Sequence, residues 1–306
     1  MRSRLWHVAQ WGLGLVIVAF VTRHVLANWE EVERADLQWR LSPPILLAAV
    51  ALVWLIFAAL ADAWRRMVAG WGRCLAWPVS ARIWLLSSMA KYVPGKVWAL
   101  AGMAVMSERN GVPAWAATAS AVILQILSLG TGAMVVAVSG LTLLPGRNMP
   151  GTAVLALLAA GSLAGTALAL WPPLTSRVVA AIAPSADLSQ VPGLNPIVFG
   201  TLANLVAWIG YGVAFWLFAR GTLPATPLTI GESIGAFTAS YVAGVIAPFA
   251  PGGLGVREGV LVLALRDRTG LATALALAAV ARLGMTVAEV SAAGPFLLRS
   301  RETGRD

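Results

Sequence analysis

The chain has 306 residues, of which 59% are hydrophobic and 11% charged, against roughly 45–50% and 25% in soluble domains. This balance excludes a soluble globular protein and predicts an all-α polytopic integral membrane protein. The 22 Lys and Arg residues outnumber the 13 Asp and Glu residues, but they sit mainly at the ends of apolar runs, so membrane topology explains them better than nucleic-acid binding. One cysteine and two histidines argue against a disulfide framework or a metal centre, and we expect no cofactor.

Two membrane spans are predicted near the start of the chain. Residues 6–27 and 43–62 are each long enough to cross, at about 20 residues per crossing. The acidic segment between them, Asn28 to Ser42, is expected outside the cytoplasm. The cations that follow predict a cytoplasmic loop, and they are Arg65, Arg66, Arg73 and Arg82.

A helix break is predicted in the middle of the next apolar segment, residues 82–106. Pro94 and Gly95 interrupt it, and each half, of roughly 12 residues, is too short to cross the bilayer alone at ~1.5 Å per residue. The two halves either enter and leave on the same side, as a re-entrant hairpin, or form one kinked span.

A second and stronger break is predicted after three further spans, at about 114–140, 151–171 and 197–219. It interrupts the apolar segment 231–266 with five helix breakers, which are Pro248, Pro251, Gly252, Gly253 and Gly255. Because backbone N–H and C=O groups freed at membrane depth cannot face lipid, the break must be buried in protein or line a wet cavity. It is therefore a candidate binding site.

The two breaks indicate an internal duplication within one transmembrane domain, residues 1–306. Each is followed by an apolar half-helix, a polar turn ending in glycine and an Ala-rich span, so repeat-like halves are expected at about 82–140 and 239–294. We favour two re-entrant helices and about six full spans, because three crossings then separate the copies and invert them, as in many transporters. The alternative is about eight spans. A last span, 271–298, leads to arginines that favour cytoplasmic N- and C-termini.

Four charges are difficult to explain as loop residues, and they are Arg257, Glu258, Arg282 and Glu289. Ionisable groups within the membrane usually face a bundle interior or a cavity, so they are candidates for substrate binding. Arg282 and Glu289 are seven residues apart and share one helix face. The alternative is an internal ion pair, such as Arg282 with Glu258, that only locks two helices.

Lys96 and Arg257 are candidates for a separate reason. Each lies in or near the first turn of a half-helix, where the macrodipole disfavours a cation by about 0.3–1 kcal/mol unless an anion is bound there. The alternatives are snorkelling of Lys91 and Lys96 to the interface and local pairing of Arg257 with Glu258. The aromatic candidates for the cavity wall, whose alternative is packing or interface anchoring, are Tyr92, Tyr241 and Trp98.

The motifs at 91–95 (Lys-Tyr-Val-Pro-Gly), 251–258 (Pro-Gly-Gly-Leu-Gly-Val-Arg-Glu) and 282–283 (Arg-Leu) resemble those of the lysylphosphatidylglycerol synthase transmembrane-region family. This family supplies the flippase-like module of multiple peptide resistance factor proteins, and the resemblance runs from about residue 8 to residue 298. It implies a multi-pass protein of a bacterial or archaeal cytoplasmic (inner) membrane that moves a lipid between leaflets. The sequence shows no aminoacyl-transferase domain, so we do not expect lysyl transfer. Gln125 stands where the repeat partner has Arg282.

The leading hypothesis is a flippase-like transporter of an anionic or phosphate-bearing lipid or lipid-linked head group. The alternative is a membrane enzyme, or an accessory subunit of one, that acts on lipid-linked sugars, and a third possibility is a structural partner of another membrane protein. The chain carries no catalytic triad, nucleotide-binding loop or paired-carboxylate site, which favours transport. Expected partners are membrane lipids, with a homo-oligomer or a glycosyltransferase as further possibilities.

Overall fold

The computed structural model describes residues 37–90, 97–143, 177, 180, 192–247 and 250–302. Every element within these ranges is helical. The helices are α3 (Pro43–Ala69), α4 (Trp77–Met89), α5 (Val97–Glu108), α6 (Ala114–Leu143), α9 (Leu194–Thr222), α10 (Ile230–Ile246), α11 (Val256–Thr269) and α12 (Leu271–Glu302), with a 3₁₀ turn, η2, at Pro251–Gly253.

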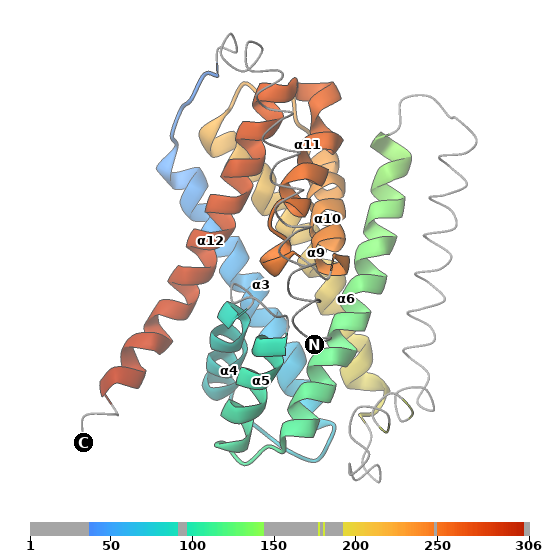
Figure 1. Ribbon diagram of the computed structural model, residues 1–306, viewed down its shortest axis with the longest axis vertical. Coiled ribbons are helices and arrows are strands. Elements are labelled where there is room, and N and C mark those ends of the chain that lie inside the picture. The colour runs from blue at the N-terminus through green and yellow to red at the C-terminus, as the bar shows by residue number, and fades with distance from the viewer. Residues whose placement is uncertain are drawn as a thin grey trace, which may run out of the picture.

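Four of these helices, α3, α6, α9 and α12, are long and apolar enough to cross a membrane. Figure 1 shows all four extending through most of the height of the molecule, and α9 packs against the other three. The expectation of an all-α polytopic membrane protein is confirmed. The predicted spans at 6–27 and 151–171 lie outside the described residues.

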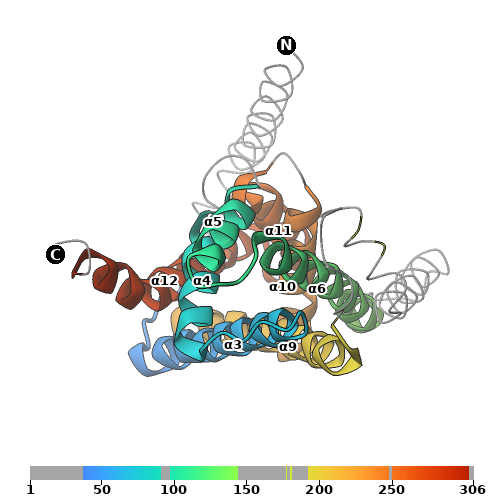
Figure 2. The same cartoon turned by 90° about the horizontal axis from the view of Figure 1, so that it is seen from below.

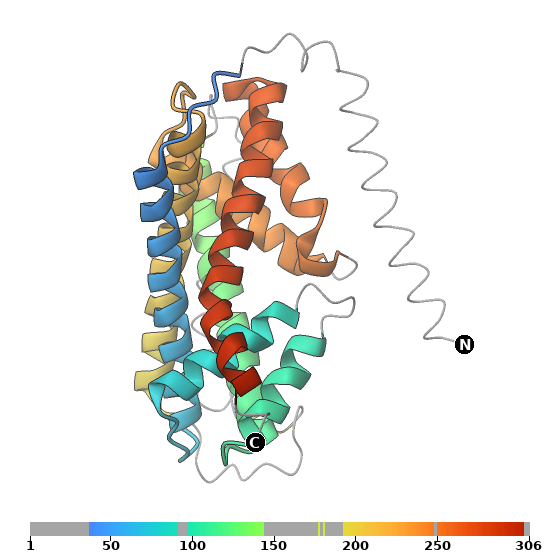
Figure 3. The same cartoon turned by 90° about the vertical axis from the view of Figure 1, so that its left-hand side faces the viewer.

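The helices on either side of each predicted break form hairpins. Arg268 Nη2 lies 2.8 Å from Glu232 Oε1, which places the end of α11 beside the start of α10. In the other hairpin, α4 packs against α5, and Gly102 of α5 faces the Cβ atom of Ser87 of α4. Figure 3 shows the hairpins reaching from opposite ends of the molecule toward mid-height. Each pair is thus a helical hairpin, the shape expected for the re-entrant arrangement.

The core is built around α9, which packs against α3, α6 and α10. Figure 2 shows α3 and α9 side by side along one edge of the bundle, with the hairpin helices across from them. The contact between α9 and α10 is very close, because a Cβ atom at Gly212 would lie 2.3 Å from Ile234 Cα. Glycine at this position therefore sets the distance between the two helices.

One predicted boundary was wrong. The sequence ends the second span at residue 62 and places Arg65 and Arg66 in a loop, whereas α3 continues to Ala69. Both arginines instead pair with Asp62 one turn earlier, each at 2.7 Å. Contacts at this spacing stabilise a helix. Trp64 is fully buried on the opposite face, so the last turns of α3 pack as core.

Candidate functional site

The second break separates α10, which ends at Ile246, from α11, which begins at Val256. Pro251 opens the 3₁₀ turn between them. Gly252, Gly253 and Gly255 have positive φ angles of 59°, 73° and 79°, a backbone region that residues with a Cβ atom rarely adopt. The break predicted from these residues is confirmed.

Arg282 and Glu258 hold this broken backbone. Glu258 Oε2 accepts a 2.8 Å hydrogen bond from the N–H of Gly255, at the start of α11. Arg282, from the middle of α12, donates through Nη1 to the carbonyl oxygen of Gly252 at 3.1 Å, and the same nitrogen lies 3.5 Å from Glu258 Oε1. The ion pair expected as an alternative is therefore present. It is coupled to the backbone groups that the break leaves free.

Arg257 points to a different set of neighbours. Its guanidinium carbon lies 4.0 Å from the centre of the Tyr241 ring and 5.8 Å from that of Phe237, both on α10. Among the described residues it forms no ion pair and no hydrogen bond, so the local pairing with Glu258 that was the alternative is not observed. A cation–π contact of this kind contributes about 0.5–2 kcal/mol. The outer nitrogens remain available to a further partner.

Two glycines make room for the stem of Arg257. A Cβ atom at Gly244 would lie 2.4 Å from Arg257 Cγ, and one at Gly253 would lie 2.6 Å from its Cδ. Real Cβ atoms do not approach other carbons so closely, so the methylenes of Arg257 pass through a slot that only glycine leaves open. The slot aims the guanidinium at the aromatic face of α10.

Aromatic rings extend from Arg257 toward α9. Tyr241 stacks on Tyr211 of α9 with 6.4 Å between ring centres and 5° between planes. Tyr211 is buried and also contacts the rings of Trp208 and Phe237, with centres 6.4 Å and 6.2 Å away. Glu289 itself is only 4% exposed, on α12 two turns after Arg282. The structure thus gathers Arg257, Glu258 and Arg282 around one break, with Glu289 buried further along α12.

The geometry of the first break is not described. Its candidates all lie outside the described residues, and they are Lys91, Tyr92, Pro94, Gly95 and Lys96. Trp98, just after that break, has a 52% exposed side chain. Among the described residues no group of three or more His, Cys, Asp or Glu side chains is arranged to hold a metal ion.

Sequence reasoning missed Phe237 and Gly244. A signal for them exists, because positions 237, 241 and 244 follow the i, i+4, i+7 spacing of one helix face. This face of α10 carries two aromatic rings and a glycine and lies next to a break that contains an arginine. The arginine side chain can pack against such a face. Recognising it required knowing that α10 and α11 fold back on each other.

The comparisons with known proteins agree with the motifs. The family model described as lysylphosphatidylglycerol synthase TM region matches residues 8–291, a range that includes both breaks and all four charged candidates. A search of curated proteins found no match. The match spans nearly the whole of the 306 residues, so the chain belongs to the lysylphosphatidylglycerol synthase TM region family.

Proposed function

We propose that the protein is a flippase-like transporter that moves an anionic or phosphate-bearing lipid between leaflets, and that Arg257 binds the head-group anion. The observation that carries the proposal is the position of this guanidinium, in the first turn of α11 and without an ion pair in the described part of the chain. A cation near the centre of a membrane helix costs about 2.5–3.5 kcal/mol, and the helix dipole adds about 0.3–1 kcal/mol. A bound anion would offset both costs.

The other charges of the site support the same chemistry. Phosphate at the start of α11 would meet the positive end of a helix and a planar guanidinium with free donors. Arg282 is only partly exposed, at 20% of its side chain, and reaches the same break from α12. In the proposed cycle Arg282 adds positive potential, and Glu289 on the same helix face lines the polar path.

Lys96 completes the proposal from the first hairpin. In this proposal Lys96, which lies outside the described residues, holds the anion in the alternate state. The hairpins reach toward each other from opposite ends of the bundle, as Figure 3 shows, which is the geometry that such an exchange requires. The first hairpin then faces the cytoplasm, on the side of Arg73, and the second faces outward.

The test is head-group movement in liposomes that contain purified protein and labelled phosphatidylglycerol. Arg257→Gln is expected to weaken lipid binding by roughly 10- to 150-fold, because a charge-assisted contact is worth about 1.5–3 kcal/mol. The matched control is Arg266→Gln, at the far end of the same helix, where the side chain is 43% exposed. Wild-type protein that moves no lipid would refute the proposal. New lipid products in mass spectra would support a membrane enzyme instead.

A further inference from the structure

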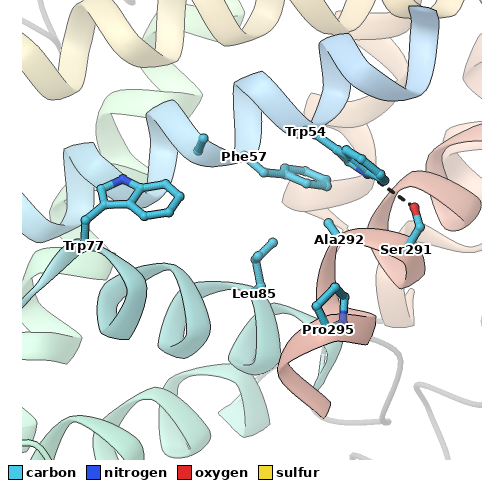
Figure 4. A pocket seen from close by; sticks show the side chains of 8 residues that line it. Trp54, Phe57, Trp77, Leu85, Ser291, Ala292 and Pro295 are labelled. Carbon is cyan, nitrogen blue, oxygen red and sulfur yellow. Dashed lines mark hydrogen bonds between the residues drawn. The ribbon is translucent and has the colours of Figure 1, made fainter. Parts of the chain in front are cut away.

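A lateral pocket of about 210 Å³ lies on another face of α12 from the arginine site. Three helices enclose it: α3, α4 and α12. Figure 4 shows Trp54 and Phe57 on one side of the pocket, opposite Leu85 and Pro295. The full lining is Trp54, Phe57, Ala58, Trp77, Leu85, Ser291, Ala292 and Pro295, and it contains no charged side chain.

Two of the three polar side chains in the wall, Trp54 and Ser291, are already hydrogen-bonded, and the third is the indole of Trp77. The indole N–H of Trp54 donates to the carbonyl oxygen of Ala288 at 3.1 Å and lies 3.2 Å from Ser291 Oγ. The hydroxyl of Ser291 in turn donates to the carbonyl of Val287 at 2.6 Å. A buried water needs two to four polar partners, and these side chains leave it few. The occupant that fits this wall is apolar.

The pocket is continuous with the lipid-facing surface. Trp54 and Trp77, which belong to its wall, are each 45% exposed. The same helices carry highly exposed apolar side chains, such as Leu55 on α3 and Val290 on α12, at 68% and 55%. In a membrane protein these residues contact acyl chains, so an acyl chain can enter the pocket without crossing a polar barrier.

The pocket is also within reach of the head-group site. Ala292 follows Arg282 by ten residues on α12, about 15 Å along the helix at ~1.5 Å per residue. An acyl chain is long enough to cover this distance, because it spans one leaflet, half of the ~30 Å hydrocarbon core. The pocket volume of about 210 Å³ accommodates roughly seven methylene-sized groups if each is given the ~30 Å³ of a water molecule.

We propose that this pocket binds a segment of the acyl chain of the transported lipid, so that the protein recognises the tail as well as the head group. The inference rests on the proposed function, because the occupant is the same phospholipid. Hydrophobic transfer does not drive this binding, since the bilayer is equally apolar. The driving force is packing against a rigid aromatic wall, which bulk lipid does not provide.

The test uses the full-length protein in nanodiscs that contain phosphatidylglycerol with a diazirine in one acyl chain. After irradiation, peptide mass spectrometry should place labels on the pocket wall more densely than on Leu55. Ala292→Trp fills the pocket and should lower labelling of the wall at least about fivefold. Val290→Trp, two residues earlier on the exposed face, is the matched control and should leave it unchanged. Ala58→Phe fills the pocket from α3 if Ala292→Trp does not fold.

The proposal is overturned if wall labelling survives either folded filling variant. It is also overturned if wild-type labelling is no denser in the pocket than at Leu55, as expected if bulk lipid or residues 6–27 of the chain occupy the space. Failure of the proposed transport function can be told apart from failure of the tail site. A protein that moves no head groups but still shows pocket labelling sensitive to Ala292→Trp retains the tail site and loses the transport role.

Discussion

Gly244→Ala tests the slot that holds Arg257 without touching any charge. The new methyl group would lie 2.4 Å from Arg257 Cγ and 3.3 Å from Gly253 Cα. The arginine side chain can move, whereas the turn around Gly253 is constrained by its φ of 73°. We therefore expect the guanidinium to leave the ring of Tyr241, while the rest of the break keeps its conformation.

The energies separate binding from stability. Alanine in place of glycine within a helix stabilises it by about 0.5–1 kcal/mol, which offsets part of the roughly 1–3 kcal/mol that overpacking costs. The melting temperature should therefore change little. Loss of the charge-assisted contact between the Arg257 guanidinium and the lipid anion should weaken anionic lipid binding roughly 10- to 150-fold. The double variant Gly244→Ala/Arg257→Gln should bind no more weakly than Arg257→Gln alone, because both changes remove the same contact.

The assay is a titration of purified protein with short-chain phosphatidylglycerol, followed by binding and by thermal shift. Gly231→Ala is the matched control, because it lies on the same helix and a Cβ atom there meets nothing within 4 Å. Wild-type affinity in a folded Gly244→Ala variant would refute the role of the slot. Additive losses in the double variant would show that Gly244 acts through something other than Arg257.

Three other predictions use different parts of the molecule. Arg282→Lys should fold but lose most lipid movement, since lysine keeps the charge that reaches Gly252 and Glu258 but loses the planar guanidinium that can hold phosphate in two bonds; full activity would leave only a charge requirement. Gly212→Ala should lower the free energy of unfolding by about 1–3 kcal/mol through its clash with Ile234, whereas Gly294→Ala, which meets nothing within 4 Å, should not; equal melting temperatures would contradict this. In a Cys74→Ser background, Arg109→Cys should react with a membrane-impermeant thiol reagent from the cytoplasmic side and Asp267→Cys from the outer side; labelling from one side alone would exclude oppositely directed hairpins.

The breaks could be predicted from the sequence because they depend on local chemistry. Proline lacks the N–H that a helix needs, and clustered glycines favour backbone angles outside the helix, so Pro251 and Gly253 predict an interruption wherever they lie in space. The contact between Arg282 and Glu258 could also be anticipated from the sequence. Both charges are too costly to leave alone in an apolar environment, and few partners were available.

The seat of Arg257 could not be predicted in the same way. The nearest opposite charge in the sequence is its neighbour Glu258, but that carboxylate accepts from the N–H of Gly255 and faces Arg282. The ring that Arg257 does contact, Tyr241, is on the other side of the break. Their meeting depends on the angle at which α11 returns along α10, a tertiary property set by the close approach of Gly244 and Gly253.

The end of α3 illustrates the opposite error. Arg65 and Arg66 satisfy the charge rule for a cytoplasmic loop, yet they belong to the helix. The rule concerns which side of the membrane a cation occupies, and it does not say where the backbone stops being helical. Asp62 pairs with both arginines, and Trp64 is buried on the other face. Both interactions stabilise the helix beyond residue 62.

The charges at the second break divide into two groups with different duties. Glu258 and Arg282 interact with backbone groups that the break leaves free, so they stabilise an interruption that lipid alone would not tolerate. Arg257 serves no such backbone group among the described residues, and its stem occupies a slot that two glycines keep open. Its described contacts are the aromatic rings and this slot, so the proposed anion would be the partner that offsets the cost of its charge. On this argument, exchanging Glu258 and Arg282 for a well-packed apolar pair would unfold the break, whereas removing the charge of Arg257 would leave the fold and weaken the proposed anion binding roughly 10- to 150-fold.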